Sequence, residues 1–383
     1  MVVLDGVGIG AAHDAANYGD ADSNTLGHVA AAVEGFALPA LERMGLGTLA
    51  PLRGVRDDVG GTGARGTLQP ASAGKDSTSG HWELCGVHLD VPFPTYPDGF
   101  PDAVIGEFAR LTGRGVVGNV AASGTAILEQ YGEAHERTGA WIVYTSADSV
   151  FQIAAHEGRV PLEELYAGCA VARGLLVPPH NVSRVIARPF EGDSSTGYRR
   201  TANRRDFSIE PPGETLLDAL GAADIARSGV GKVDDLFARR SISATHTSGN
   251  AEGIARIHAW LAGAAGGLLF ANLVDFDQLF GHRNDTGGFY RALREFDDAL
   301  PGLLSLLRED DLLVITADHG NDPTTPSTDH ARERVPLLVA GPRVRPVALG
   351  ERSTFSDVGA TLGAWFGLAF RGRGTSFLTE LLA

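Results

Sequence analysis

Three apolar runs that each end in acidic residues constrain the fold of this chain more than any other feature. They are VVLD (2–5), GLLFANLVDFD (267–277) and DLLVITADHG (311–320). Short apolar runs closed by polar residues are typical of buried strands in a largely parallel sheet. Ligands of open α/β sheets gather at the carboxyl ends of such strands, so we expect the three endings to share one crevice. Because the runs are far apart in the sequence, distant parts of the chain must build the same core.

A second domain is expected between the first two runs. A chain of 383 residues exceeds what one hydrophobic core usually supports. Proline-rich punctuation at 92–102 and 208–215 is typical of domain crossings. Between these segments, apolar residues at helical spacing stop at Gly113 and Gly174, while WIVYTSADSV and SRVIARPF are typical of strands. We therefore predict a metal-binding catalytic core of residues 1–91 and 209–383, with an inserted α/β cap of residues 92–208.

The net charge and the hydrophobic pattern of the chain argue against several classes of function. The net charge of −15 argues against nucleic acid as a partner, because phosphate neutralisation requires a basic surface. No run approaches the roughly 20 apolar residues that span a membrane, and the N-terminus lacks a signal-peptide pattern. The first apolar run is short for a central strand, so either a short strand or missing upstream sequence is expected. Two cysteines fit a reducing cytoplasm, and Cys169 is expected to pack in a core.

Lysine occurs at only two positions, Lys75 and Lys232, among 32 basic residues. Both lysines stand in glycine-flanked loops. An ammonium is a compact point charge, so we expect each lysine at a site that requires one. An acidic chain needs such local positive charge, from cations or metals, to attract an anionic substrate.

Six residues near the three strand ends have the character of metal ligands. Aspartate and histidine on loops suit divalent cations of intermediate hardness, such as Mn²⁺ or Zn²⁺. Two such ions would clamp the attacking and leaving oxygens of phosphoryl transfer. The sequence therefore predicts a two-metal site for phosphoryl transfer, built from Asp5, Asp277, His282, Asp318, His319 and His330.

A nucleophile is expected in the glycine-bounded loop GKDSTSGHWE (74–83). Its residues Ser77, Thr78 and Ser79 offer hydroxyls, which a metal ion is able to activate. A Ser/Thr-rich turn that only starts a helix is the alternative interpretation. Spacing alone does not choose among these hydroxyls.

Seven longer motifs occur in order across nearly the whole chain: KDSTSGHWE, PFPTYPDGFP, VYTSADSVFQIAAHE, RVIARPF, NLVDFDQLFGHR, TADHGNDPTTPSTDH and GTSFL. Together they resemble prokaryotic phosphopentomutases of the alkaline phosphatase superfamily. The resemblance implies an alkaline-phosphatase-like α/β core with an inserted cap. It also implies an isomerase that interconverts ribose 1-phosphate and ribose 5-phosphate, or the deoxyribose pair. Two Mn²⁺ ions, a phosphorylated side chain and a sugar bisphosphate activator belong to the same implication.

The resemblance further implies roles for individual residues. One metal would be held by Asp5, Ser77, Asp318 and His319, and the other by Asp277, His282 and His330. Ser77 would be the catalytic residue that carries the phosphoryl group. The sugar phosphate would meet the cap residues Ser146, Asp148, Arg184, Ile186 and Arg200 and the core residues Lys232 and Lys75.

Four departures from the family pattern keep alternatives open. Ser77 replaces a threonine, Asn24 an acidic residue and Arg205 a histidine, and the loop after His282 is one residue longer. A related mutase acting on a modified pentose phosphate is one alternative, and a metal-dependent phosphatase of the same superfamily is another. The segment GVGIGA (6–11) also matches a loose dinucleotide fingerprint, but a second strand that ends in an acidic residue is missing.

Overall fold

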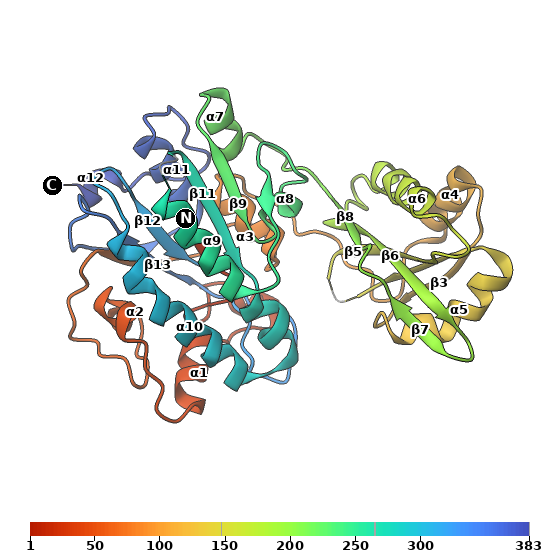
Figure 1. Ribbon diagram of the computed structural model, residues 1–383, viewed down its shortest axis with the longest axis horizontal. Helices are drawn as coiled ribbons and strands as arrows, with labels where there is room; N and C mark the ends of the chain where they lie inside the picture. The colour runs from red at the N-terminus through yellow and green to blue at the C-terminus, as the bar shows by residue number, and fades with distance from the viewer. Residues whose placement is uncertain (147, 264–265, 383) are drawn as a thin grey trace. The chain divides into compact units, whose positions relative to one another are not determined.

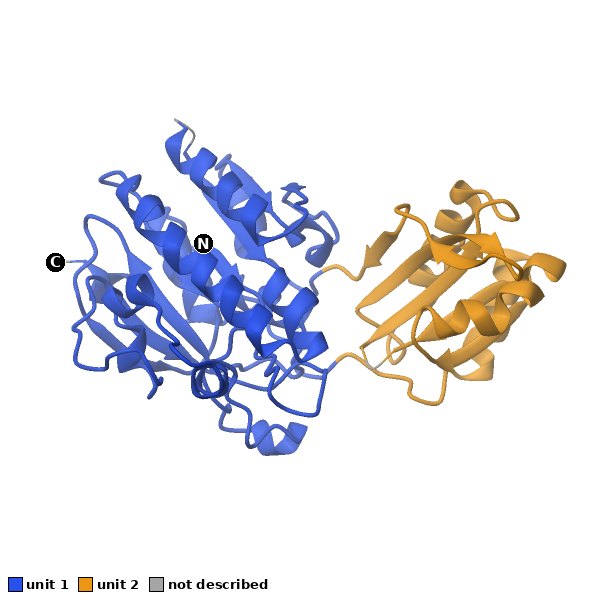
Figure 2. Ribbon diagram, turned by 60° about the horizontal axis from the view of Figure 1, so that its bottom comes forward, with its two compact units in different colours: residues 1–92, 211–383 blue, residues 93–210 orange. Residues whose placement is uncertain are grey.

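The computed structural model describes residues 1–146, 148–263 and 266–382 (Figure 1). The chain forms two compact units, a core unit of residues 1–92 and 211–383 and an inserted unit of residues 93–210 (Figure 2). Both crossings fall within the proline-rich segments that the sequence marks. The catalytic and cap roles assigned to the predicted domains stay predictions.

The core unit is built on an eight-stranded sheet that is largely parallel, as predicted. The strand order is β10-β9-β11-β1-β12-β13-β2-β14, and only β13 runs antiparallel to its neighbours. Every residue of β1, β11, β12 and β13 is buried, which explains their continuous apolar runs. The strands are β1 (Val2–Leu4), β2 (Ala64–Leu68), β9 (Arg227–Val230), β10 (Ala244–Thr245), β11 (Leu268–Leu273), β12 (Leu313–Thr316), β13 (Val335–Ala340) and β14 (Ala348–Arg352).

Helices cover both faces of this sheet. Figure 1 shows α9 and α10 in front of the sheet and α3 and α11 behind it. The α-helices of the core unit are α1 (Thr25–Ala32), α2 (Pro39–Arg43), α3 (Ser77–Leu84), α7 (Leu216–Ala222), α8 (Val233–Leu236), α9 (Asn250–Ala262), α10 (Thr286–Ser305), α11 (Ser356–Trp365) and α12 (Leu378–Leu381). Shorter turns are η1 (Ala15–Tyr18), η2 (Leu46–Thr48), the π-helical η3 (Phe276–Phe280) and η4 (Gly281–Arg283). Within the described ranges, no helix is long and apolar enough to cross a membrane.

The inserted unit is a second α/β layer structure. Its strands follow the order β3-β4-β5-β6-β7, with β8 also paired to β6. Helices α4 and α6 pack against a cluster that includes Phe108, Trp141 and Cys169, and α5 packs on the other cluster around Ile127 and Phe190. The buried thiol of Cys169 is thus core packing, as expected. The elements are α4 (Asp102–Thr112), β3 (Val116–Ala121), α5 (Ala126–Thr138), β4 (Trp141–Thr145), β5 (Val150–His156), α6 (Leu162–Leu175), β6 (Arg184–Asp193), β7 (Gly197–Arg200) and β8 (Arg205–Ser208).

Two details predicted for the inserted unit are wrong. The run WIVYTSADSV is not continuous strand, because β4 ends at Thr145 and β5 begins at Val150. Residue 147 of that run lies outside the described residues. Helix α6 also continues past Gly174 to Leu175, because its residues keep helical hydrogen bonding there. Helix α4 does end before Gly113, whose φ of 68° is in the left-handed region that favours glycine.

The glycines after β1 form a tight turn and not a dinucleotide-binding loop. Gly6 has a φ of 74°, and its N–H donates to Oδ1 of Asp318 at 3.2 Å. A Cβ at Gly8 would lie 2.3 Å from Oε2 of Glu333. Within the fully described stretch 1–146, the first α-helix after β1 begins only at Thr25. A dinucleotide-binding turn leads directly into a helix, so this segment is a tight turn behind Asp5.

Candidate two-metal active site

The site lies at the carboxyl ends of three neighbouring strands. Strand β1 pairs in parallel with β11 on one side and with β12 on the other. Asp5 follows β1 directly, Asp277 follows β11 inside the π-helical turn η3, and Asp318 follows β12. All three carboxylates are buried. The ends of the three apolar runs therefore lie side by side, as the sequence predicts.

A first cluster consists of Asp5, Asp318 and His319, all buried. Nε2 of His319 lies 3.3 Å from Oδ1 of Asp5 and 3.4 Å from Oδ2 of Asp318. One ligand atom from each residue lies within 4.8 Å of the others. This spacing suits a single divalent cation among the three side chains.

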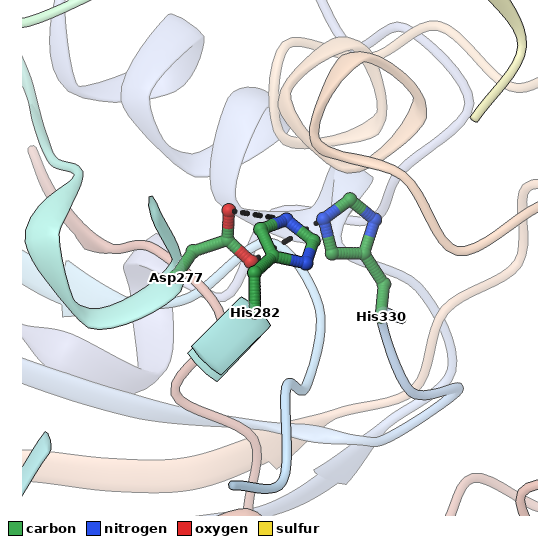
Figure 3. Close-up of side chains that lie close together, drawn as sticks. All are labelled: Asp277, His282 and His330. Carbon is green, nitrogen blue, oxygen red and sulfur yellow. Dashed lines mark ion pairs between the residues drawn. The ribbon is translucent and has the colours of Figure 1, made fainter. Parts of the chain in front are cut away.

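A second cluster consists of Asp277, His282 and His330. In Figure 3 the carboxylate of Asp277 faces both imidazole rings. Nε2 of His282 lies 3.1 Å from Oδ2 of Asp277, and Nε2 of His330 lies 3.3 Å from Oδ1. The six residues predicted from the sequence thus come together in two groups of three, and their role as metal ligands stays a prediction.

The histidine rings are oriented for metal binding. Nδ1 of His282 lies 2.6 Å from the carbonyl oxygen of Thr328, and Nδ1 of His319 lies 3.0 Å from that of Gly320. A carbonyl only accepts, so each Nδ1 carries a hydrogen, and the Nε2 of each ring, when neutral, has a lone pair directed at the cluster. A backbone carbonyl that fixes the imidazole in this way is typical of histidines that bind metals.

The charge balance of the crevice also fits metal ions. Burial, followed by the neighbouring carboxylates of Asp318 and Asp277, raises the pKa of Asp5 above its usual range. Oδ1 of Asp5 and Nε2 of His330 are buried without a hydrogen-bond partner in the described part of the chain. Buried carboxylates that crowd together require compensating positive charge. The residues present therefore fit divalent cations.

Ser77 joins the first cluster. It is the first residue of α3, and its Oγ lies 3.0 Å from Nε2 of His319. The neighbouring Ser79 instead bonds Asp76, donating from its backbone N–H to Oδ1 at 3.1 Å and from its hydroxyl to the carbonyl at 2.8 Å. Asp76 caps the helix through the first of these bonds. The loop thus starts a helix and also directs one hydroxyl at a candidate metal ligand.

The two lysines lie in different surroundings in the core unit. Nζ of Lys75 lies 3.0 Å from Oδ2 of Asp20 and 3.5 Å from Oδ2 of Asp329. Lys232 donates to the side-chain oxygen of Gln278, the residue directly after Asp277.

The substrate residues expected in the inserted unit partly come together. Nη2 of Arg184 lies 3.9 Å from Oδ2 of Asp148. Arg184 and Ile186 alternate on β6, so their side chains share one face of the sheet. Nη2 of Arg200 donates to the hydroxyl of Tyr144 at 3.1 Å. Ser146 directly follows β4.

Three residues that support the clusters were not predicted. Asn272 donates to Oδ2 of Asp5 at 3.0 Å, and Asn321 donates to Oδ1 of Asp277 at 2.6 Å. His81 is fully buried, and its Nδ1 lies 3.1 Å from Oδ2 of Asp318. His81 follows Ser77 by four residues on a helix, which is a spacing that places both on one face. That spacing is the only sequence signal that points to any of the three.

Two of the departures from the family pattern have structural roles. Oδ1 of Asn24 accepts from the N–H of Gly27 at 3.2 Å and so caps α1, a position that asparagine and aspartate fill equally well. The guanidinium of Arg205 lies over the ring of Tyr166 at 5.2 Å and over that of Phe207 at 5.0 Å. Both substitutions therefore fit their local surroundings.

Known proteins match the chain along its whole length. A model of the metalloenzyme superfamily matches residues 1–369. The phosphopentomutase of Carboxydothermus hydrogenoformans is 54% identical over 383 residues, covering 100% of this chain and 98% of that protein. The phosphopentomutase of Herpetosiphon aurantiacus is 52% identical with the same coverage, and that of Anaeromyxobacter sp. is 53% identical. Together with the two ligand clusters, these matches show that the chain belongs to the phosphopentomutase family of the metalloenzyme superfamily, whose fold is alkaline-phosphatase-like.

Proposed function

We propose that this phosphopentomutase, an isomerase, interconverts ribose 1-phosphate or 2-deoxyribose 1-phosphate with the 5-phosphate through a phosphoserine at Ser77. The observation that carries the proposal is the 3.0 Å contact between Oγ of Ser77 and Nε2 of His319. It is the contact expected of a nucleophile that shares a cation with its neighbouring ligands. A pentose bisphosphate would be the intermediate, and a sugar bisphosphate would load the enzyme.

Two divalent cations, Mn²⁺ in our proposal, would neutralise charge on the transferring phosphoryl group and lower the pKa of a nearby hydroxyl. Asp5, Asp318, His319 and Ser77 would hold one, and Asp277, His282 and His330 the other. The geometry of the two clusters, with Nε2 directed inward, supports this assignment.

The chain's own residues would carry the transfer as follows. The free hydroxyl oxygen of a pentose monophosphate forms a bond to the phosphorus of phospho-Ser77 while the Oγ–P bond breaks. The proton of the sugar hydroxyl ends on Oγ of Ser77. The bisphosphate then turns, and Oγ takes the other phosphoryl group in the reverse step. Ser77 begins helix α3, where N–H groups and the helix dipole favour the negative charge of the phosphoserine.

The other residues would bind the sugar phosphate. Arg184 and Arg200 provide guanidinium groups for phosphate oxygens, and Ser146, Asp148 and Ile186 would contact the sugar. Lys232 and Lys75 would add point charges from the core unit. Burial of both thiols, Cys85 and Cys169, supports a cytoplasmic location as part of the same proposal.

The proposal is tested by mixing Mn²⁺-loaded protein with ribose 5-phosphate and a catalytic amount of pentose 1,5-bisphosphate. After chelation of the metal, ³¹P NMR distinguishes the products. Ribose 1-phosphate supports the proposal. Steady release of inorganic phosphate would instead indicate a phosphatase, and no reaction would indicate another pentose phosphate as substrate.

Variants of Ser77 test the covalent step. Ser77→Ala should lower the mutase rate by about 10³-fold or more, because removal of a nucleophile abolishes the covalent route. Ser77→Thr keeps the hydroxyl and should stay active, which makes it the matched control. Full activity of Ser77→Ala with both metals bound would show that the assignment is wrong.

A further inference from the structure

A buried arginine outside both metal clusters fixes the loop that carries Ser77. Arg332 lies two residues after His330, and only 3% of its surface is exposed. We infer that Arg332 is a positioning residue, which holds the Ser77 loop in register with the segment that carries His330. The inference rests on the proposed role of Ser77.

All five N–H groups of the Arg332 guanidinium donate hydrogen bonds. Nε and Nη2 form a two-pronged contact with the carboxylate of Asp14, at 3.0 and 2.9 Å. The remaining bonds reach the carbonyl oxygens of Pro70 at 2.9 Å, Ser72 at 2.6 Å and Gly74 at 2.5 Å. Arg332 thereby fixes the carbonyl groups of three alternate residues, and these residues lead into the loop that carries Ser77.

A second set of contacts fixes the same loop through Tyr18 and Asp20. The guanidinium of Arg332 lies over the ring of Tyr18 at 4.8 Å, and the hydroxyl of Tyr18 accepts from the N–H of Gly74 at 3.2 Å. The backbone N–H of Arg332 donates to Oδ2 of Asp20 at 2.8 Å. Asp20 in turn pairs with Lys75, two residues before Ser77. The loop is therefore held at both Gly74 and Lys75.

The backbone beside Arg332 is tied to both metal clusters. Ala331 and Gly320 exchange two hydrogen bonds, of 3.0 and 2.7 Å. Gly320 directly follows His319 of the first cluster, and Ala331 directly follows His330 of the second. A displacement of the Ser77 loop relative to Arg332 is therefore a displacement relative to both sets of ligands.

Only arginine meets the demands of this position. Its planar fork matches the two oxygens of Asp14 and leaves donors for three carbonyls, whereas lysine has three donors around one nitrogen. Buried carbonyls left without donors are costly, so a lysine would let the loop shift to find other partners. Shifts of about 1 Å in a reacting group are sufficient to lower a rate about 10²-fold.

The test compares Arg332→Lys with the wild type, using the metal-loaded full chain and pentose 1,5-bisphosphate as phosphoryl donor. The first-order rate of phosphorylation of the protein is followed by intact-mass spectrometry after rapid quenching. We expect a drop of about 10- to 100-fold in this rate and in kcat. KM for ribose 5-phosphate and the content of two metals per chain should stay near the wild-type values. A general loss of structure would change both. Arg334→Lys is the matched control, because Arg334 is half-buried and, among the described residues, its side chain contacts the Ile9 carbonyl and Glu351 instead of the Ser77 loop.

A phosphorylation rate of Arg332→Lys within about twofold of the wild type would overturn the inference. If Arg332→Lys fails to fold, Asp14→Asn replaces it, because this change keeps the guanidinium and removes only the charge of its partner. It should slow phosphorylation about 3- to 10-fold, and a wild-type rate would again overturn the inference. Peptide mapping of the phosphorylated residue distinguishes a failure of the proposed nucleophile from a failure of the inference about Arg332. A label at a residue other than Ser77 would refute the proposed nucleophile, whereas the rate ratio tests Arg332.

Discussion

Nδ1 of His81 lies 3.1 Å from Oδ2 of Asp318, and neither side chain is exposed to solvent. The same nitrogen lies 2.9 Å from the carbonyl oxygen of Ser77. The imidazole ring stacks on Phe270 with 5.5 Å between the ring centroids. His81 therefore links a candidate metal ligand to the residue that we propose as nucleophile.

Replacing this histidine should weaken metal binding. In His81→Phe an aromatic ring remains against Phe270, but Asp318 loses its polar neighbour. We expect the affinity of the first site for Mn²⁺ to fall about 10- to 100-fold, as measured by metal titration of activity. His246→Phe is the control, because His246 makes a similar contact of 2.7 Å with Asp234 away from the two clusters. Unchanged affinity in His81→Phe would contradict a supporting role.

Metal ions should stabilise the folded chain. The three buried carboxylates of Asp5, Asp277 and Asp318 repel one another without a cation, so the chelated protein should melt at a lower temperature. Free Mn²⁺ at about 100 times the Kd of a site should add about 2.7 kcal/mol to the free energy of unfolding for each site that it fills. The melting temperature of chelated protein is measured during Mn²⁺ titration. Asp277→Asn should reduce the gain and Asp234→Asn should not, so an equal gain in both would place the bound ion elsewhere.

Glu333 should make stability depend on pH. Burial raises the pKa of Glu333 from 4.5 to about 7, although N–H donors from Gly10 and Thr25 oppose the shift. At pH values between 4.5 and about 7, Glu333 is protonated in the folded state and ionised in the unfolded state. The free energy of unfolding should therefore fall by about 3 kcal/mol as the pH rises through this window, and the slope should end above it.

The glutamine variant isolates this contribution. Glu333→Gln cannot ionise, so urea unfolding at about pH 5 and about pH 8 should show a smaller difference than in the wild type. Glu351→Gln serves as the control, because Glu351 is partly exposed and near the surface. An identical pH dependence in Glu333→Gln and the wild type would mean that Glu333 is ionised throughout.

Gly124 should be required for the position of Arg200. A Cβ at Gly124 would lie 1.0 Å from Nη2 of Arg200, the nitrogen that bonds the hydroxyl of Tyr144. Gly124→Ala should displace the guanidinium and raise KM for the sugar phosphate about 10-fold, with a smaller effect on kcat. Gly106→Ala is the control, because no described atom beyond the chain neighbours and the backbone of its own helix lies within 4 Å of the added methyl group, and alanine favours helix α4. If both variants keep the wild-type KM, Arg200 does not bind the substrate.

The residues of the site that could be predicted are those whose side-chain type alone indicates their chemical role. Buried parallel strands read as continuous apolar runs, and acids and histidines that follow three such strands together are typical of metal ligands. Asn272 and Asn321 could not be predicted, because an amide becomes a supporting residue only through contact with a distant segment. Arg332 was missed for a related reason. Most of its partners are backbone carbonyls, which leave no mark on the sequence.

The place of β1 between β11 and β12 has a consequence for synthesis of the protein. Asn272, which bonds Asp5, is made 267 residues later, and Asp318 is made later still. During translation β1 is therefore made long before β11 and β12, the strands that it pairs with. The inserted unit has its own hydrophobic cores and is complete before β11 and β12 are made. A growing chain that stops before β12 holds no first cluster of ligands. The first cluster of candidate ligands is thus complete only after β12 and His319 have been made.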